Sequence, residues 1–208
     1  LWSPGVREGV KPGSEYHMTE YFGPILGIMT ADTLEEAIEL QNAPDYGLTA
    51  GLHSLDADDL ELWLSKVQAG NVYVNRGITG AIVRRQPFGG WKKSTVGSGT
   101  KAGGPNYLVA LTDWEPDHAT ATTVPQSVAV REVLATAEGA SLCGAKDFEF
   151  IKRSASSDAH AWETEFGYGH DPSKLGVERN ILRYLPTQVL VRADESAPAA
   201  EVVRVVLA

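Results

Sequence analysis

The stretch that decides the fold is GLTAGLHSLDADDLELWLSKVQAGNVYVN, residues 47–75. Its first part, residues 47–54, consists of small and apolar residues and predicts a strand. Asp56 can cap a helix that ends just before Gly70, the predicted C-terminal stop, because a carboxylate accepts hydrogen bonds from the first helical amides. Residues 71–75 (NVYVN) have the pattern of a second strand. A strand, a helix and a strand at this spacing predict a right-handed crossover in an α/β sheet.

The same alternation extends toward the N-terminus. An apolar run at residues 24–29 (PILGIM) lacks clear polar alternation and predicts a buried strand. Thr33 and Glu36 have the capping-box spacing, in which each side chain satisfies an amide of the first helical turn, and Pro44 stops that helix. Residues 1–19 are rich in glycine and proline and are expected to be extended or looped.

The pattern changes downstream of this region. Residues 76–106 are rich in glycine and have little periodicity, and loops of this length in a compact domain are usually functional. Strand character returns at residues 106–114 (NYLVALTDW), and the polar residues 115–126 are interpreted as a linker. The remaining predicted elements are helices at 128–140 and 157–166, strands at 181–186 and 188–192, and an apolar helical pattern at 200–208.

The composition is that of a globular protein, and it disfavours several classes of function and location. Of 208 residues, 43% are hydrophobic and 22% are charged, which is enough for a core. A formal net charge of −9 disfavours direct binding to nucleic acid, because an acidic surface repels phosphates. No apolar run approaches the ~18 residues that a transmembrane segment needs. The single cysteine, Cys143, excludes an intrachain disulfide and favours a cytoplasmic location.

Both ends of the sequence look interrupted. It begins at Leu1 without a secretory signal segment. It finishes in an apolar helical pattern with no glycine, asparagine or proline stop behind it. We therefore expect a piece of a longer polypeptide, and both a natural fragment and a truncated reading frame stay open.

Three motifs resemble the aldehyde dehydrogenase superfamily. They are EYFGP at residues 20–24, YGLTAGLHS at 46–54 and AGNVYVNRGITGAIVRRQPFGGWKKS at 69–94. The sequence is most similar to the L-glutamate γ-semialdehyde branch, also called 1-pyrroline-5-carboxylate dehydrogenase, in the version that forms the dehydrogenase module of bifunctional proline utilization A proteins. A looser likeness to the accessory C-terminal domain of long family members lies in the tail, at residues 158–167, 178–186 and 189–192.

The resemblance implies a fold and a reaction. Residues 1–114 would form the C-terminal part of an aldehyde dehydrogenase catalytic domain with an oligomerisation strand, residues 115–126 a linker, and residues 127–208 part of an α/β accessory domain. In the reaction, an aldehyde forms a thiohemiacetal on a cysteine, passes hydride to NAD and is released by hydrolysis as glutamate. The implied partners are glutamate semialdehyde, the remainder of the parent polypeptide and further copies of that parent in a homo-oligomer.

Glu20 and Phe22 are the cofactor-binding residues that the resemblance implies. In the family, the glutamate of the E-x-F-G-P motif accepts hydrogen bonds from the nicotinamide ribose hydroxyls of NAD, which suits a group with two acceptor oxygens. The phenylalanine presses its ring against the nicotinamide. Taken alone, the two residues fit a strand-edge acid and a core aromatic better, and the complete motif reverses that preference.

Gly80 and Ala81 are the residues implied for binding the substrate carboxylate, and Phe88 for lining the aliphatic portion of the substrate. Backbone amides would hold the anion, which requires small residues because a side chain would block its approach. A plain glycine-rich surface turn is the alternative on residue types alone. Arg84 and Arg85 could pair with a carboxylate, but adjacent arginines are more often solvated or structural and are left out of the site.

No catalytic residue and no metal ligand is assigned within this sequence. The catalytic cysteine of the family precedes the E-x-F-G-P motif, whereas Cys143 follows it and is interpreted as a small buried hydrophobe. The five histidines show no metal-ligand spacing. Residues 97–102 (GSGTKA) have the spacing of a dinucleotide fingerprint, but no strand precedes them, so that interpretation is rejected. The isolated chain is therefore expected to show no aldehyde oxidation.

Two alternatives to a fragment of a glutamate-semialdehyde dehydrogenase stay open. In the first, the strand at 106–114 and the tail form a non-catalytic structural module that seals an oligomer interface. In the second, the chain belongs to an aldehyde dehydrogenase of another substrate, and the choice depends on Gly80 and Ala81.

Overall fold

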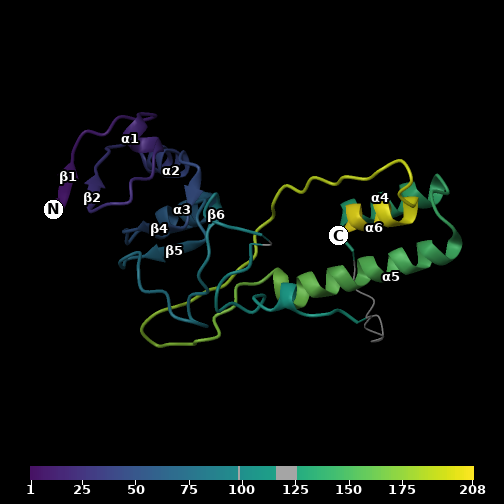
Figure 1. The fold of residues 1–208 in the computed structure, drawn as a ribbon. Helices are drawn as coiled ribbons and strands as arrows, with labels where there is room; N and C mark the ends of the chain where they lie inside the picture. Colours follow the sequence, from purple (N-terminus) through teal and green to yellow (C-terminus); the bar gives the residue numbers. More distant parts are fainter. Residues whose placement is uncertain (98, 116–125) are drawn as a thin grey trace. The chain divides into compact units, whose positions relative to one another are not determined.

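The computed structural model describes residues 1–97, 99–115 and 126–208, which form two compact units (Figure 1). Unit 1 consists of Leu1–Thr112 and Pro172–Asn180, and unit 2 of Asp113–Asp171 and Ile181–Ala208. The chain mixes helices with strands, as the sequence predicts for an α/β fold. The predicted linker at 115–126 lies almost entirely outside the described residues.

The predicted strand, helix and strand of unit 1 occur in the predicted order (Figure 1). β4 (Thr49–Leu52) pairs in parallel with β5 (Asn71–Val74), and α3 (Ala57–Lys66) connects them. The Asp56 carboxylate caps α3, as predicted, by accepting a hydrogen bond from the amide of Asp58 at 2.8 Å. The local signals in this stretch therefore produce the expected strand, helix and strand.

The helix before this crossover, α2 (Leu34–Asn42), begins at the predicted cap. The Thr33 hydroxyl accepts from the amide of Glu36 at 3.2 Å. The Glu36 carboxylate accepts, at 2.7 Å, from the amide of Asp32, which precedes Thr33 and lies outside the first helical turn that was predicted to supply the donor. α2 and α3 share one apolar core, in which Trp63 is 2% exposed. The buried members of that core are Ile38, Ala50, Trp63, Val67 and Ala69.

Gly70 does not stop α3, contrary to the prediction. The helix ends at Lys66, and the backbone of Val67 is already extended. Gly70 is instead required by close packing, because a Cβ atom at this position would lie 1.9 Å from the carbonyl oxygen of Gly89. The requirement for glycine therefore comes from a segment that is distant in the sequence, and not from the end of the helix.

The strands of unit 1 do not form one continuous sheet. β2 (Ile25–Gly27) pairs in parallel with β1 (Gly5–Arg7), which lies in a segment predicted to be extended or looped. β3 (Tyr46–Gly47) pairs antiparallel with β6 (Trp91–Lys92), and among the described strands neither pair joins β4 and β5. Leu26 is 60% exposed. The prediction that this apolar run is buried is therefore wrong, because no other described segment covers it.

The strand predicted at 106–114 is also absent from the described structure. Its centre forms the single-turn 3₁₀ helix η1 (Val109–Leu111), whose backbone hydrogen bonds are local. Leu111 and Trp114 are 74% and 75% exposed. A strand is stable only when a neighbouring strand satisfies its backbone groups, and the described part of the chain supplies none here.

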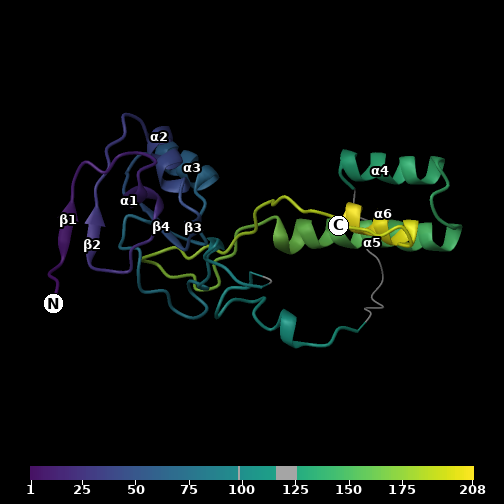
Figure 2. The same cartoon turned by 45° about the horizontal axis from the view of Figure 1, so that its top comes forward.

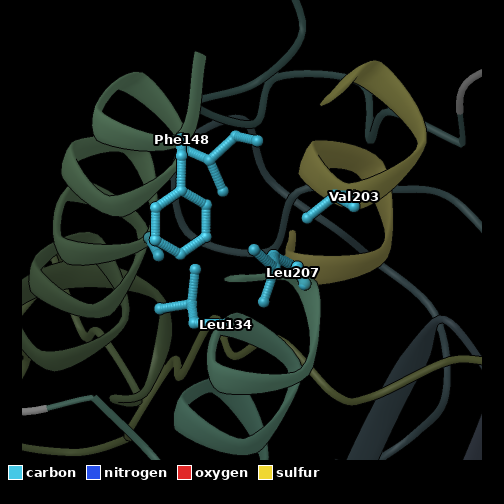
Figure 3. Close-up of a cluster of buried hydrophobic side chains, with 7 residues drawn as sticks. Leu134, Phe148, Val203 and Leu207 are labelled. Atoms are coloured by element: carbon cyan, nitrogen blue, oxygen red, sulfur yellow. The ribbon is translucent and has the colours of Figure 1, made fainter. Parts of the chain in front are cut away.

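Unit 2 is built of helical segments. They are α4 (Val128–Gly139), α5 (Ala145–Ala161), the short π-helix η2 (Trp162–Phe166) that continues α5, and α6 (Ala199–Leu207). Figure 3 shows Leu134, Phe148, Val203 and Leu207 converging from α4, α5 and α6 into one apolar core. α4 and α6 confirm two predicted helices, and α5 begins at Ala145, earlier than the sequence pattern indicates.

The two strands predicted in the tail, at 181–186 and 188–192, are wrong. Leu182 forms one isolated bridge with His170, and Val189 is 76% exposed. The apolar composition gives these residues strand propensity, but within the described residues no strand lies beside them to pair with.

None of the helices in residues 1–97, 99–115 and 126–208 combines the length and apolar character that crossing a bilayer requires.

Candidate functional site

Glu20 and Phe22 lie on the segment between the short helix α1 (Glu15–Met18) and β2. Both side chains are exposed, and Phe22 is 98% exposed. A large aromatic side chain with almost its whole surface in solvent does not contribute to packing within this chain. The pair is therefore accessible to a group outside the described residues.

The residue between them, Tyr21, fixes the course of this segment. Its ring stacks on Tyr16 of α1 with the ring centroids 5.3 Å apart. Its hydroxyl donates a hydrogen bond to Glu15 Oε1 at 3.1 Å. Because Tyr21 is held against α1, its two neighbours are presented from a defined position. A carboxylate and an exposed ring on such a segment fit a ligand that carries both hydroxyls and a flat ring.

Gly80 and Ala81 lie near the middle of the loop that follows β5, residues 76–88, which we call the 76–88 loop. Gly80 has φ +85°, and a Cβ atom there would meet no other atom within 4 Å. Glycine is thus required by the backbone conformation and not by lack of space. Within the part of the chain that the structure describes, the amides of Gly80 and Ala81 have no hydrogen-bond acceptor. Adjacent free amides of this kind can hold an anion.

Phe88, at the end of the same loop, is held by its neighbours. Its amide donates to Ala102 O at 3.0 Å, and its carbonyl accepts from the amide of Ala102 at 2.8 Å. Asn71, which is 7% exposed, forms hydrogen bonds with the backbone on both sides of Phe88. Asn71 Nδ2 donates to Pro87 O, and Asn71 Oδ1 accepts from the amide of Gly89, both at 3.1 Å. The backbone of Phe88 is therefore fixed from two directions.

Lys101 completes the support of this end of the loop. Its ammonium group donates to the carbonyl oxygens of Gly70 and Gly89, each at 2.6 Å. Burial lowers the pKa of Lys101 from 10.5 to about 8. Neither Asn71 nor Lys101 was predicted from the sequence to support the site. Asn71 could have been found, because a polar residue at the first position of a buried strand indicates a structural role. No feature of the local sequence marks Lys101 as different from the other lysines.

The arginines left out of the predicted site differ in their surroundings. Arg85 Nη1 lies 4.0 Å from Glu178 Oε1, and Arg76 Nη1 lies 3.1 Å from Glu178 Oε2. Arg84 is exposed and has φ +65°. Glu178 belongs to Pro172–Asn180, a part of the tail that the sequence analysis did not connect with this loop. Arg85 is thus placed as a structural arginine.

The structure shows no bonded contact between the two groups of predicted residues within its described part. Among the described residues, no hydrogen bond or ion pair joins Glu20 or Phe22 to the 76–88 loop. Cys143 lies elsewhere, partly buried against the helical core of unit 2, in agreement with its structural interpretation. In the described part of the chain, no three His, Cys, Asp or Glu side chains gather closely enough to hold a metal ion.

Residues 1–115, more than half of the chain, match the aldehyde dehydrogenase family, so the chain belongs to this family. This confirms the resemblance predicted from EYFGP and the two longer motifs.

Three relatives narrow the similarity to one branch. The chain is 42% identical over 106 residues to a 1-pyrroline-5-carboxylate dehydrogenase of Geobacillus sp. (strain WCH70), covering 51% of this chain and 20% of that protein. It is 41% identical over 111 residues to the bifunctional protein PutA of Rhizobium meliloti, covering 51% of this chain and 9% of that protein. The structure of Proline Utilization A (PutA) from Corynebacterium freiburgense is 48% identical, with a TM-score of 0.84 over 99% of this chain and 20% of that one. The chain therefore spans about a fifth of the length of these relatives, or less.

Proposed function

We propose that this chain is part of an NAD-dependent dehydrogenase that oxidises L-glutamate γ-semialdehyde to glutamate in proline catabolism. Relatives with the names 1-pyrroline-5-carboxylate dehydrogenase and PutA support this activity. The observation that carries the proposal is the pair of adjacent amides at Gly80 and Ala81, which lack an acceptor in the described part of the chain. These amides bind the substrate carboxylate. A cytoplasmic location remains a prediction from the sequence.

The substrate-binding role divides along the 76–88 loop. The amides of Gly80 and Ala81 donate to the carboxylate, since two adjacent N–H donors favour an anion over a neutral group. Phe88 lines the aliphatic portion of the substrate, and Asn71 and Lys101 keep its backbone in place. The distance between the anion-binding amides and the aromatic wall then selects an acidic aldehyde of suitable length.

The cofactor-binding role belongs to Glu20 and Phe22. The Glu20 carboxylate accepts hydrogen bonds from two neighbouring ribose hydroxyls, and Phe22 contacts the nicotinamide ring. Exposure of both side chains in this structure fits that role. NAD, when bound, supplies the oxidant for the aldehyde, and this chain supplies the groups that orient both molecules.

A change of Gly80 to valine in the complete protein tests the substrate assignment. A β-branched residue cannot adopt φ +85° without strain, so the amides are displaced. Losing hydrogen bonds to a charged group, at about 1.5–3 kcal/mol, should raise the KM for glutamate semialdehyde about ten- to hundredfold. The KM for butanal, which has no carboxylate, should change less than about twofold. Gly77→Ala is the control, because a Cβ atom at Gly77 also meets nothing within 4 Å, whereas the backbone there does not have a positive φ.

Equal changes in the KM for both aldehydes would refute the carboxylate assignment and favour a dehydrogenase of another substrate. Gly77→Ala should leave both constants within about twofold of the wild type, since it adds one methyl group in open space.

A structural module that seals an oligomer interface is the second candidate. It is favoured by exposed apolar side chains where a strand was predicted, including Leu108, Leu111 and Trp114. The proposed occupant of this surface is a second copy of the complete protein. Analytical ultracentrifugation of Leu111→Glu protein tests it, and an unchanged oligomeric state with unchanged dissociation constant would reject this role for the segment.

A further inference from the structure

We infer that Glu178 and Asn180 are positioning residues, which hold the 76–88 loop so that its free amides face the substrate carboxylate. This inference rests on the function proposed for those amides. Both residues belong to Pro172–Asn180, a segment of the tail that packs within unit 1. The segment, yellow-green in Figures 1 and 2, runs beside the loop that follows β5.

Asn180 is buried and uses both ends of its amide group. It is 7% exposed. Its Oδ1 accepts from Gln86 Nε2 at 2.5 Å, while its Nδ2 donates to Ser173 Oγ at 3.0 Å and to Glu178 Oε1 at 3.2 Å. A side chain amide with partners on the oxygen and on the nitrogen has one orientation. Asn180 therefore offers Gln86 a fixed acceptor.

Gln86 passes this constraint to the backbone beside Ala81. Its side-chain Oε1 accepts from the backbone amide of Ile82 at 2.9 Å, and the backbone amide of Gln86 donates to Ile82 O at 2.9 Å. Two hydrogen bonds in series thus connect Asn180 with the residue that directly follows Ala81. The amide of Ile82 is occupied by this contact, whereas those of Gly80 and Ala81 remain available within the described structure.

Glu178 holds the same loop through charge. Its carboxylate lies 3.1 Å from Arg76 Nη1 and 4.0 Å from Arg85 Nη1, so it pairs with arginines near both ends of the loop. The Arg76 guanidinium also lies over the ring of Tyr73 in β5, 5.4 Å from its centroid. Because the Glu178 side chain is only 30% exposed, the pairing is partly shielded from water. The two ends of the loop are thereby tied to one carboxylate.

Steady-state kinetics of the complete protein test this role. The variants are Asn180→Ala, Gln86→Ala and the double variant, with Glu195→Gln as an exposed control. Each single change should raise the KM for glutamate semialdehyde about tenfold, because anchored amides become mobile. The KM for butanal and the KM for NAD should stay within about twofold. The double variant should resemble either single variant, because both residues act through one series of hydrogen bonds.

A KM that rises equally for both aldehydes, or effects of the two single changes that multiply in the double variant, would overturn the inference. If Asn180→Ala protein does not fold, the nearly isosteric Glu178→Gln provides the same test through the arginine pairs, with the same split expected between the two aldehydes. The proposed function fails separately. In that case wild-type protein does not oxidise glutamate semialdehyde, or Gly80→Val affects both aldehydes alike, whereas failure of the positioning role leaves those two results intact.

Discussion

Replacement of Gly70 by alanine should loosen the segment that carries Phe88. The added Cβ atom would lie 1.9 Å from Gly89 O and 2.7 Å from Gly90 Cα, so one backbone segment must shift by about 1 Å. Gly70 itself cannot retreat freely, since its amide donates to Gly47 O at 3.0 Å. Overpacking of this kind is worth about 1–3 kcal/mol.

The displacement also breaks contacts of the Lys101 ammonium group, which bridges Gly70 O and Gly89 O. Each lost hydrogen bond adds about 1 kcal/mol, which gives a total of about 3–5 kcal/mol in local stability. Hydrogen exchange measured by mass spectrometry on peptides covering residues 87–102 of the complete protein reports this quantity directly. Exchange should accelerate at least about a hundredfold in Gly70→Ala.

Gly77→Ala is the control for the same chemical change, because the new methyl group meets nothing within 4 Å. Its peptides over residues 87–102 should exchange at the wild-type rate. Wild-type exchange in Gly70→Ala would refute the reasoning, because it would mean that the Gly70 and Gly89 backbones are not in contact in the complete protein.

Three further outcomes are expected. Because burial lowers the pKa of Lys101 to about 8, the folded protein loses this proton before the unfolded chain, and stability rises as the pH increases from about 8 to 10.5. Lys101→Met should remove about 1–2 kcal/mol of this rise in the free energy of unfolding, a value reduced for solvent screening of a half-buried group. An identical shift in Tm between pH 7.5 and 9.5 in the wild type and the variant would contradict this expectation. Ile151→Ala should destabilise the helical core by about 2–5 kcal/mol in urea unfolding, whereas Phe150→Ala, 55% exposed on the same helix, should cost less than about 1 kcal/mol. The isolated chain should neither oxidise glutamate semialdehyde nor show a sharp cooperative melt, given the exposed apolar surface of β1 and β2, and a sharp melt of a monomer would contradict the second part.

The elements that the sequence predicted correctly depend on local signals. The cap at Asp56 and the alternation of residues 71–75 act within one turn or one strand, and they produced α3 and β5 as expected. Residues 188–192 have an equally apolar composition, but a strand requires a neighbour, and none lies beside them in the described structure. Strand pairing is non-local, so composition alone could not distinguish the two cases.

The support of the candidate site was missed for the same reason. Gly70 was interpreted as a helix stop, because a sequence does not show that another backbone approaches a glycine. Gln86 and Asn180 are separated by more than ninety positions, and no periodic pattern relates a polar residue in a loop to one in the tail. The predicted residues at Gly80 and Ala81 came from a motif, whereas the groups that orient them come only from the fold.

The contacts of the 76–88 loop would account for the proposed selectivity of its amides. Free amides on a mobile loop would bind an anion weakly, since ordering the loop would consume most of the binding energy. Here Asn71 fixes one end of the loop, while Glu178 and Asn180 hold positions near both ends. Residues between these supports keep amides without acceptors in the described chain. A loop that is anchored near its ends and has free amides between the anchors favours a carboxylate at one position. Under the proposed function, changes at Asn71, Glu178 or Asn180 should therefore lower selectivity between acidic and neutral aldehydes before they lower the rate of the chemical step.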